Sequence, residues 1–468
     1  MKILFVTSEA NPYFKTGGLA DVSRSLPDAL LAAGHDVRIV LPMFARVREN
    51  LDSAEPGDEA LVPWPGGPVP VRYVGHRATD DGALAVLVDQ PGFFEAGSPY
   101  DGVLHDPLSA GRRFAFFCRA AVMYARAWNP DVVHLNDWTS GFVPVYGLLD
   151  GLEAPTLFAI HNLAHQGNFP PALLDQVGVP RDLFRTENGI EFMGTASFLK
   201  AGIALSDRLV TVSPTYAREI QTPAYGAGLD GLLRFRRRVL RGIVNGIDTR
   251  VWDPSSDPHI ARHFNHASLD AKDENRDAFL ARSGLDPDGP LFVMVGRLAH
   301  QKGVDLVLHA LPDILAAGAR IAILGSGDAA WERELQRAAR ARPDRIASFI
   351  RFDDSLAHRM YAGADFFLMP SRYEPCGLGQ MIAQRYATPP VVRTTGGLVD
   401  TVTDGKTGFV FDDPTPPAVA AAVRRAADVW RARGWTALRR RCMKLDHSWA
   451  RSALLYDEAY RAAAGSSA

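Results

Sequence analysis

The chain has 468 residues, more than the roughly 250 that one hydrophobic core usually serves, so we expect two large domains. Its 51 basic and 53 acidic residues leave a formal net charge of -2. This near balance excludes a global attraction to nucleic acid or to an anionic membrane. An anionic ligand must therefore be bound by charges that are placed locally.

Export and membrane signals are not found in the sequence. The opening apolar run, residues 3–6, is much shorter than the apolar core of a secretion signal, and no run of about 18 apolar residues follows. The three cysteines are widely spaced and fit neither a disulfide framework nor a metal motif: Cys118, Cys376 and Cys442. We therefore expect a protein of the reducing cytoplasm with no membrane partner.

The first half of the chain alternates short β-branched runs with amphipathic segments. It begins with a predicted strand at residues 2–8, a helix at 19–34 and a strand at 36–42. Further strands are predicted at residues 131–135, 156–162, 207–213 and 241–247, with a helix at 112–128. Apolar runs of this kind are typical of buried parallel strands joined by crossover helices.

A second alternating series follows a stretch rich in Pro, Asp, Ser and His after Asp248, where we place the domain boundary. Its strands are predicted at residues 291–298, 321–327, 346–352, 365–371 and 389–395. The fold class is therefore α/β, with two Rossmann-like, doubly wound parallel-sheet domains. Such sheets bind ligands outside the carboxyl ends of their strands, which predicts an interdomain cleft.

The sequence thus predicts an N-terminal domain of residues 1–248 and a C-terminal domain of residues 249–446. The remaining segment, residues 447–468, has apolar positions at helical spacing. We expect it to form a helix that packs back onto the N-terminal domain.

The loop after the first strand reads KTGGLADV and contains Lys15, Gly17 and Gly18 just ahead of a helix. A Gly-Gly turn lets backbone amides approach a ligand, and the helix N-terminus and Lys15 add positive potential suited to phosphate. The pattern is neither a Walker loop nor GxGxxG, so a purely structural turn is an equal alternative.

Two cations follow the first strand of the second series, in the stretch GRLAHQKGVD. Arg297 and Lys302 are five residues apart on a loop that enters a helix, where they can bind one diphosphate. A solvated surface pair explains the spacing equally well.

A carboxylate, Glu374, lies in SRYEPCGLGQ after the predicted strand at 365–371. At the carboxyl end of a strand it is well placed to hold sugar hydroxyls. The alternative is an acidic residue that only stabilises the N-terminus of the next helix.

Polar and aromatic residues also end two strands of the first domain. HLNDWTSG contains Asp137 and Trp138, and HNLAHQGNF contains His161 and Asn162. Rings of this kind stack on sugar faces, while amides and carboxylates hold hydroxyls. Each residue taken singly is more often a satisfied polar group, but their shared position at strand ends favours a carbohydrate site.

The motifs that are missing narrow the chemistry. The only Asp-x-Asp pair, Asp286 and Asp288, belongs to the turn DPDG, so no metal-carboxylate clamp is predicted. GxSxG, HExxH and the P-loop do not occur, which argues against a serine hydrolase, a zinc protease and a P-loop NTPase. We therefore expect positive side chains to take the place of a metal.

The sequence resembles the glycogen and starch synthases of glycosyltransferase family five along nearly its whole length. The resemblance is carried by SEANPYFKTGGLADV, HLNDWTSG, FAIHNLAHQGNF, GIVNGIDTRVWDP, GRLAHQKGVD, SRYEPCGLGQM and RTTGGLVDTV. It implies the GT-B fold and retaining transfer of glucose from ADP-glucose to the non-reducing end of an α-1,4-glucan such as glycogen. It further implies a donor bound mainly by the second domain, an acceptor approaching the first, and no metal or other cofactor.

The resemblance also assigns individual residues. Those expected to act in catalysis are His161, Glu374, Asp137, Arg297 and Lys302. Those expected to bind substrate are Lys15, Gly17, Gly18, Asp21, Asn162, Asn245, Phe352, Cys376 and Gly377.

In this assignment Arg297 and Lys302 complete a donor-phosphate pocket with Lys15 and stabilise the leaving ADP. His161 lies against the donor glucose near the anomeric carbon, and Asp137 lies toward the acceptor. Because family members have no agreed carboxylate nucleophile, the resemblance favours front-face attack over a covalent intermediate.

The remaining assignments concern the sugar and the base. Glu374 and the amides of residues 376–377 hold sugar hydroxyls, and Asp21 and Asn245 are supporting contacts. Phe352 stacks on the adenine.

Three positions depart from related patterns. Ile382 stands where the Glu-x7-Glu transferases carry a second glutamate, which family five also lacks. Phe352 and His165 stand where family five would be expected to have tyrosine. Phe352 can stack on a base but cannot donate a hydroxyl hydrogen bond, which weakens the prediction of base selectivity.

Two other functions fit parts of the pattern. One is a GT-B glucosyltransferase that uses UDP-glucose or a non-glucan acceptor; KTGGL and the missing second glutamate argue against it. The other is a non-catalytic protein that binds sugar nucleotides or glycans, which would be expected to have lost a site residue. The five residues whose loss would indicate this are all present: Lys15, His161, Arg297, Lys302 and Glu374.

Overall fold

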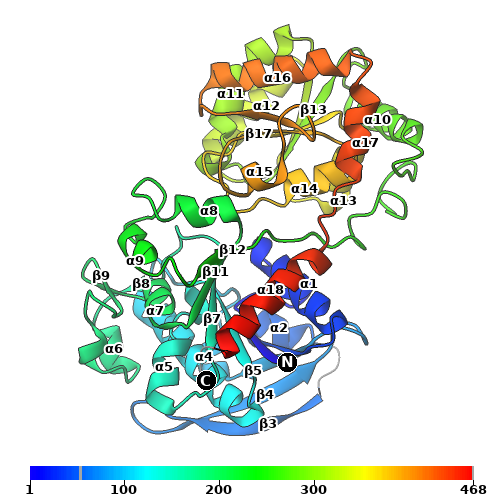
Figure 1. The fold of residues 1–468 in the computed structure, drawn as a ribbon. Coiled ribbons are helices and arrows are strands. Elements are labelled where there is room, and N and C mark those ends of the chain that lie inside the picture. The colour runs from blue at the N-terminus through cyan, green and yellow to red at the C-terminus, as the bar shows by residue number, and fades with distance from the viewer. Residues whose placement is uncertain (52–54, 466–468) are drawn as a thin grey trace. The chain divides into compact units, whose positions relative to one another are not determined.

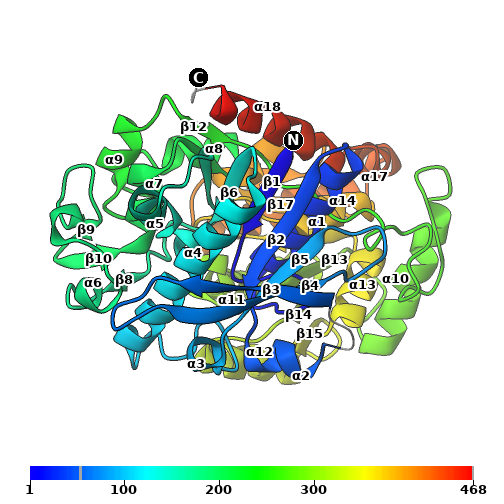
Figure 2. The ribbon, with the colours of Figure 1, turned by 90° about the horizontal axis from the view of Figure 1, so that it is seen from below.

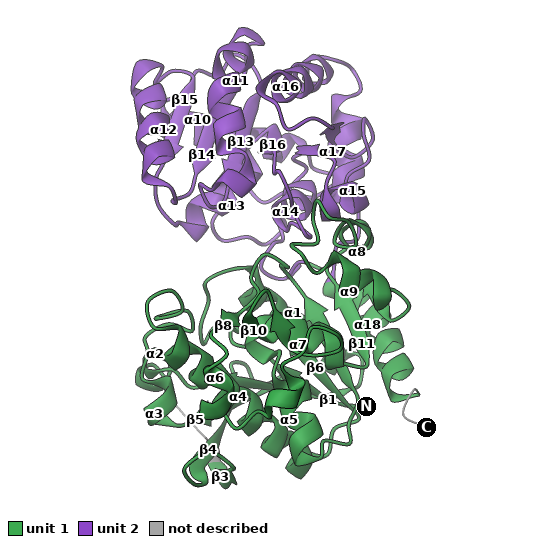
Figure 3. Ribbon diagram, turned by 90° about the vertical axis from the view of Figure 1, so that its left-hand side faces the viewer, with its two compact units in different colours: residues 1–246, 449–468 green, residues 247–448 purple. Residues whose placement is uncertain are grey.

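The structure is a computed structural model that describes residues 1–51 and 55–465. It divides into two compact units, drawn in different colours in Figure 3. Unit 1 comprises residues 1–246 and 449–468, and unit 2 comprises residues 247–448. Residues 466–468, the end of the predicted C-terminal helical segment, lie outside the described residues.

Unit 1 is built on a large sheet (Figure 1). The strands of unit 1 as a whole are β1 Lys2–Val6, β2 Asp36–Pro42, β3 Glu55–Val62, β4 Val69–His76, β5 Leu84–Asp89, β6 Val132–Asn136, β7 Thr156–Ile160, β8 Asn168–Phe169, β9 Glu191–Phe192, β10 Thr195–Ser197, β11 Arg208–Thr211 and β12 Leu240–Gly242. Its α-helices are α1 Gly18–Ala32, α2 Ala45–Glu49, α3 Pro91–Phe94, α4 Pro107–Trp128, α5 Val143–Asp150, α6 Leu173–Gln176, α7 Phe198–Leu205, α8 Pro214–Glu219, α9 Asp230–Phe235 and α18 Trp449–Ala464. Two 3₁₀ turns are η1 Trp138–Ser140 and η2 Arg181–Leu183.

The nine strands of the large sheet run in the order β12-β11-β7-β6-β1-β2-β5-β4-β3. From β12 to β5 every pair is parallel, while β4 pairs antiparallel with both β5 and β3. The strands β1, β6 and β7 at the centre are almost fully buried. This burial explains why they read as continuous apolar runs rather than as alternating ones.

Helix α4 shows how local sequence sets the ends of an element. The Asp106 carboxylate accepts a hydrogen bond of 3.2 Å from the Ser109 amide, and Pro107 occupies the first helical turn. The helix ends where Asn129 takes the left-handed conformation, with φ of 52°. An Asp cap, a proline in the first turn and a left-handed Asn at the end are common helix boundary signals.

The C-terminal helix α18 belongs to unit 1 and contacts α1, β6 and β7 (Figure 1 and Figure 2). The Tyr460 hydroxyl lies 2.7 Å from Nδ1 of the buried His134 on β6. The Ser452 hydroxyl donates to the carbonyl of Val244, and Arg241 pairs with Glu458 at 2.8 Å. Side-chain bonds along the length of α18 therefore fix it to unit 1.

Unit 2 holds a six-stranded sheet, all parallel, in the order β15-β14-β13-β16-β17-β18. Its strands are β13 Leu291–Val295, β14 Arg320–Leu324, β15 Ile346–Phe349, β16 Phe366–Met369, β17 Pro390–Arg393 and β18 Phe409–Phe411. Its helices are α10 Asp270–Ser283, η3 His300–Lys302, α11 Val304–Ala316, α12 Ala329–Ala341, α13 Asp354–Gly363, α14 Gly379–Arg385, α15 Gly396–Thr401, α16 Pro416–Trp430 and α17 Trp435–Met443. Helices α11 and α16 pack together, as do α13 and α14, and Figure 1 shows the two pairs on opposite faces of the sheet.

The predicted fold class, α/β with two doubly wound parallel-sheet domains, is confirmed. The parallel strands β5 and β18 lie outside the predicted strands, and two further features were not predicted. The sheet of unit 1 has an antiparallel edge, β3–β4, joined by a turn in which Gly66 and Gly67 have φ of 92° and 127°. A small antiparallel sheet, β8-β10-β9, is also present.

Helix α10 starts at Asp270, inside the stretch rich in Pro, Asp, Ser and His where the domain boundary was predicted. Within the described residues, no helix is long and apolar enough to cross a membrane.

We expect Tyr460→Phe to destabilise unit 1 by about 1 to 3 kcal/mol, because Nδ1 of His134 would be left buried without its partner. Urea unfolding measures this change. Leu454→Ala is the control on the same helix, since Leu454 is 65% exposed and its loss should change stability by less than about 0.5 kcal/mol. Equal stability of Tyr460→Phe and the wild type would show that this contact does not hold α18.

Candidate active site

The glycine loop of unit 1 joins β1 to α1. Gly17 is the cap residue of α1 and Gly18 is its first residue, so the amides that begin the helix lie in this loop. The Lys15 ammonium pairs with the Asp21 carboxylate at 2.9 Å, and both side chains are more than one third exposed. Asp21 lies in the first turn of α1, where the helix dipole favours negative charge.

Glu9 holds this loop in place, and the sequence analysis did not single it out. Its buried carboxylate accepts hydrogen bonds from the amide and the hydroxyl of Thr16, at 2.6 and 2.7 Å. The Tyr100 hydroxyl donates a third bond, at 2.5 Å. Like Asp137, Glu9 is a carboxylate shortly after a buried strand, so the same signal was available in the sequence.

Asp137, His161 and Asn162 come together where β6 and β7 end. Oδ1 of Asp137 accepts from the His161 amide at 2.8 Å and, at 3.4 Å, from the Asn162 amide. Asp137 has φ of 52°, a conformation in which a non-glycine residue is strained, and such strain clusters at functional sites. Trp138 follows at the start of η1, with its ring buried against Phe114.

Asn136 is the second residue that the sequence analysis passed over. It ends β6, is fully buried, and its Oδ1 lies 2.9 Å from Nε2 of His161. Its Nδ2 donates to the carbonyl of Val6 at 3.0 Å.

Burial sets the protonation states of this cluster. It raises the pKa of Asp137 to about 7, against the opposing effect of the two amide donors, and nearby Glu9 raises it further. Burial lowers the pKa of His161 to about 4. At neutral pH the His161 ring is therefore uncharged, and the Asp137 carboxyl is close to the midpoint of its titration.

Asn245 follows β12 and is buried, and its Oδ1 has no hydrogen-bond partner in the described part of the chain. A buried oxygen without a donor is costly, so such a group is uncommon in a folded protein. No described contact joins Asn245 to the other candidate residues.

In unit 2, Lys302 and Glu374 form an ion pair, with Nζ 2.6 Å from Oε2. The Ser371 hydroxyl donates to the same carboxylate oxygen at 2.9 Å. The side chains of Lys302 and Glu374 are 20% and 7% exposed. Two residues that the sequence placed after different strands, β13 and β16, thus meet at one point.

Glu374 lies five residues before α14, and the first turn of that helix has no acidic residue. This position does not support the alternative that Glu374 serves only the helix dipole, whose effect fades beyond the first turn.

Arg297 follows β13 and is itself exposed, and its guanidinium is 3.5 Å from the side-chain oxygen of Gln301. Gln301 in turn donates to the carbonyl of Tyr373, next to Glu374. One connected segment therefore carries Arg297 and Lys302 and touches the loop of Glu374.

The backbone of the stretch RTTGG packs closely against the backbone of the loop that carries Glu374. A Cβ on Gly396, which has φ of 45°, would lie 1.9 Å from the Glu374 carbonyl oxygen, and one on Gly397 would lie 2.2 Å from that of Cys376. The Gly397 amide donates to the Glu374 carbonyl at 3.1 Å. Only glycine permits this close approach of two backbones.

Cys376 and Gly377 follow Glu374, Cys376 being buried and Gly377 having φ of 75°. The buried Gln380 side chain donates to the carbonyls of both residues, at 3.1 and 2.9 Å. These two hydrogen bonds hold the carbonyls of Cys376 and Gly377 toward Gln380 and so restrict the conformation of the loop.

Three positions depart from the patterns of related transferases: Phe352, Ile382 and His165. Phe352 lies after β15 and is 78% exposed, so its ring face is open. Ile382 is buried in α14, an apolar place for the glutamate of other transferases. His165 is exposed on the loop after β7.

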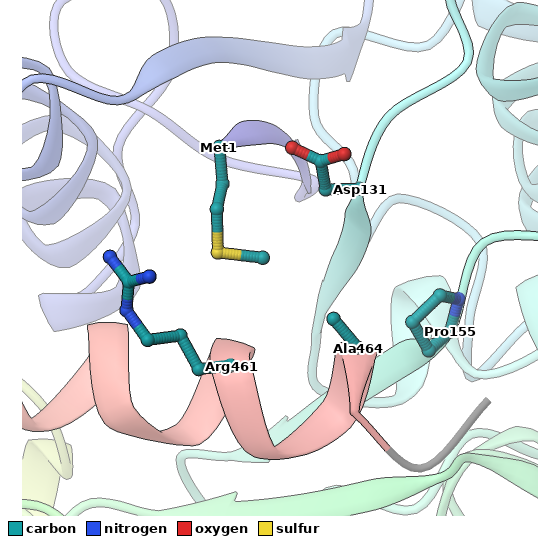
Figure 4. A pocket seen from close by; sticks show the side chains of 5 residues that line it. All are labelled: Met1, Asp131, Pro155, Arg461 and Ala464. Atoms are coloured by element: carbon teal, nitrogen blue, oxygen red, sulfur yellow. The ribbon is translucent and has the colours of Figure 1, made fainter. Parts of the chain in front are cut away.

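A cavity of about 480 Å³ lies elsewhere in unit 1, at the amino ends of its strands. Its lining, drawn in Figure 4, is Met1, Asp131, Pro155, Arg461 and Ala464. It shares no residue with the candidate site. Over the described ranges, no three His, Cys, Asp or Glu side chains gather so as to hold a metal ion.

Comparison with known proteins adds independent evidence. Residues 2–235 match the family model of the starch synthase catalytic domain, and residues 275–437 match that of the group 1 glycosyl transferases. The chain is 45% identical to the glycogen synthase of Anaeromyxobacter dehalogenans (strain 2CP-1), over 98% of this chain and 99% of that protein. It is 44% identical to the glycogen synthase of Aromatoleum aromaticum, over 98% and 96% of the two chains.

Solved structures agree. The catalytic domain of starch synthase IV from Arabidopsis thaliana, bound to ADP and acarbose, matches with a TM-score of 0.89 and 30% identity over 99% of both chains. Fold and matches together define a glycosyltransferase of the GT-B type. Within that class, the chain belongs to the glycogen (starch) synthase family.

The raised pKa of Asp137 predicts a pH dependence of stability. Between about pH 4 and pH 7 the carboxyl is protonated when folded and ionised when unfolded, so this group makes stability fall as pH rises. We expect the wild type to lose up to about 1.4 kcal/mol per pH unit more than Asp137→Asn over this range. Urea unfolding at pH 5 and pH 7 measures the difference, and identical pH dependence in both proteins would contradict the assignment.

Proposed function

We propose that the chain transfers glucose from ADP-glucose to the non-reducing end of an α-1,4-glucan with retention of the anomeric configuration, and that it works in the cytoplasm. Family membership over the whole length supports the glucan-elongating activity. The related starch synthase IV structure contains ADP, which supports the choice of nucleotide. Three buried free thiols fit a reducing compartment: Cys118, Cys376 and Cys442.

The observation that carries the proposal is the Lys302–Glu374 pair after β13 and β16. Nucleotide and sugar ligands of such sheets bind beyond the carboxyl ends of the strands. A cation next to an acceptor-rich carboxylate suits a ligand that carries a phosphate beside a hydroxyl-rich sugar. Arg297, five residues before Lys302, supplies a second, exposed positive group.

In this proposal the groups of unit 2 bind most of the donor. Arg297 and Lys302 neutralise the diphosphate and stabilise the charge that grows on it as it leaves. Glu374 and the amides of residues 376–377 bind glucose hydroxyls. Phe352 offers its exposed ring to the adenine face.

The groups of unit 1 serve the phosphate, the reacting sugar and the acceptor. Lys15 and the amides of Gly17 and Gly18 are phosphate contacts, supported by Asp21 and Asn245. Lys15 is available only when it exchanges Asp21 for phosphate, which the exposure of both side chains permits.

His161 faces the donor glucose near its anomeric carbon, with Asn162 beside it, and Asp137 lies toward the acceptor. The bond between the anomeric carbon and the ADP β-phosphate oxygen breaks while the acceptor 4-hydroxyl oxygen bonds to the same carbon on the same face. The hydroxyl proton passes to the departing phosphate oxygen. Charge balance is then kept without a covalent glucosyl-enzyme.

A donor panel tests the proposal directly. We expect glucose transfer to glycogen from ADP-glucose, with kcat/KM at least about tenfold above that for UDP-glucose. Radiolabel incorporated into precipitated glucan measures it. A preference for UDP-glucose, or transfer only to non-glucan acceptors, would replace this function by that of another GT-B transferase, and no transfer at all would favour a binding protein.

We expect Lys302→Ala to lower kcat about a hundredfold and Glu374→Gln to lower it about tenfold or more, because both act on charge that develops in the transition state. The matched control is Arg276→Ala. Arg276 pairs with Asp365 in the same unit at 2.9 Å, with side chains 14% and 4% exposed.

Each of the three substitutions removes one partner of an ion pair and should lower the melting temperature. Only the first two should lower kcat. Wild-type kcat in both, with a melting shift like that of Arg276→Ala, would show that the Lys302–Glu374 pair is part of the scaffold.

We also expect activity to survive excess EDTA, because side chains and amides are assigned to the phosphates. Initial rates with and without chelator measure this. Activity that returns only when Mg²⁺ or Mn²⁺ is added would contradict it.

A further inference from the structure

The contacts of Asn136 decide which nitrogen of His161 carries the proton. The amide of Asn136 touches two groups, the carbonyl of Val6 at 3.0 Å and Nε2 of His161 at 2.9 Å. A carbonyl only accepts hydrogen bonds, so the NH₂ end of the amide must face Val6. The oxygen end then faces His161, and because this oxygen only accepts, Nε2 must carry the hydrogen.

The second ring nitrogen is left as an acceptor. Uncharged imidazole carries one hydrogen, so Nδ1 has a free lone pair when Nε2 is protonated. In the described structure Nδ1 has no protein partner, and it is not among the buried polar atoms that lack one, so solvent reaches it. His161 is half-buried while Asn136 is fully buried, which places the protonated nitrogen inward.

We propose that Asn136 is a positioning residue that holds His161 as the neutral Nε2–H tautomer, so that Nδ1 accepts a hydrogen bond from a hydroxyl of the donor glucose. The proposal rests on the function proposed above for His161. It assigns His161 the role of an acceptor and excludes proton donation by its exposed nitrogen. A ring that is already held in one tautomer and one orientation does not have to reorganise when the sugar binds.

The surroundings of His161 agree with an uncharged ring. Burial lowers its pKa to about 4. The titratable groups around it are Asp137, whose carboxylate accepts from the His161 main chain, Glu9 beside Asp137, and His134 two residues before Asn136 on β6. The first holds the backbone and not the ring, and burial keeps His134 uncharged.

Nitrogen-15 NMR of protein labelled at histidine tests the tautomer directly, with His161→Gln used to assign the signals. We expect the Nε2–H pattern in the wild type from pH 8 down to about pH 5. The Nδ1–H pattern, or a ring charged at pH 7, would overturn the proposal. This measurement needs no activity, so it stands even if the donor panel fails.

Substitution of Asn136 tests the link to catalysis. In Asn136→Ala we expect a mixture of tautomers and a fall in kcat of about tenfold. In Asn136→Asp the new carboxylate stabilises the imidazolium, so the pKa of His161 rises and kcat falls with decreasing pH through the new value. Asp137 also titrates near pH 7, and the NMR titration of the labelled histidine separates the two groups.

Asn275→Ala is the matched control, since Asn275 is a buried amide in unit 2 that also bonds to main-chain groups, the amide of Ala261 and the carbonyl of Arg262. It should lower stability without changing kcat or the His161 signals. A folded Asn136→Ala with the wild-type tautomer and rate would overturn the proposal. If Asn136→Ala does not fold, the wild-type tautomer and the pH profile of Asn136→Asp decide it.

Discussion

Burial of the central strands on both faces is the constraint that organises this protein. Residues of β1, β6 and β7 have almost no exposed surface, and neither have those of β14 and β16 in unit 2. Such strands cannot carry charged chemistry along their length, because an unpaired charge in the core costs several kcal/mol. Polar groups with a role in binding are therefore confined to the loops at the strand ends, where candidate residues such as Asp137 and Glu374 lie.

Three carboxylates that follow these strands have different hydrogen-bond partners. Glu9 accepts from two hydroxyls and an amide, and Glu374 is paired with the ammonium of Lys302. Among the described residues, only main-chain amides donate to the Asp137 carboxylate, and its pKa rises to about 7. The pKa of Asp137 thus rises because the effect of burial outweighs the two amide donors that oppose it.

The sequence predicts a feature well when its signal lies in neighbouring residues, and poorly when the feature depends on contacts between residues far apart in the chain. Periodicity located most of the parallel strands, though not β5 and β18, because their apolar runs are local. Position after a strand selected Asp137, His161 and Glu374. The Lys302–Glu374 contact joins residues 72 positions apart, and the sequence around neither residue indicates that the two meet. The antiparallel edge was missed because β3 and β4 resemble neither the buried runs nor each other, although the glycines of their turn signalled a hairpin.

Asn136 and Gly396 show a second kind of information that local patterns do not contain. Both lie in stretches that the resemblance singled out, yet neither suggests a function by its own chemistry. Asn136 acts through the two groups its amide touches, and Gly396 acts through the missing Cβ that lets its backbone meet the Glu374 carbonyl. The carboxylate and the imidazole would be present without these neighbours, but a hydrogen bond to a sugar is directional and weakens steeply when its angle is poor. In the proposed function, residues that fix orientation therefore matter alongside those expected to touch the ligand, and the three-dimensional contacts identify them.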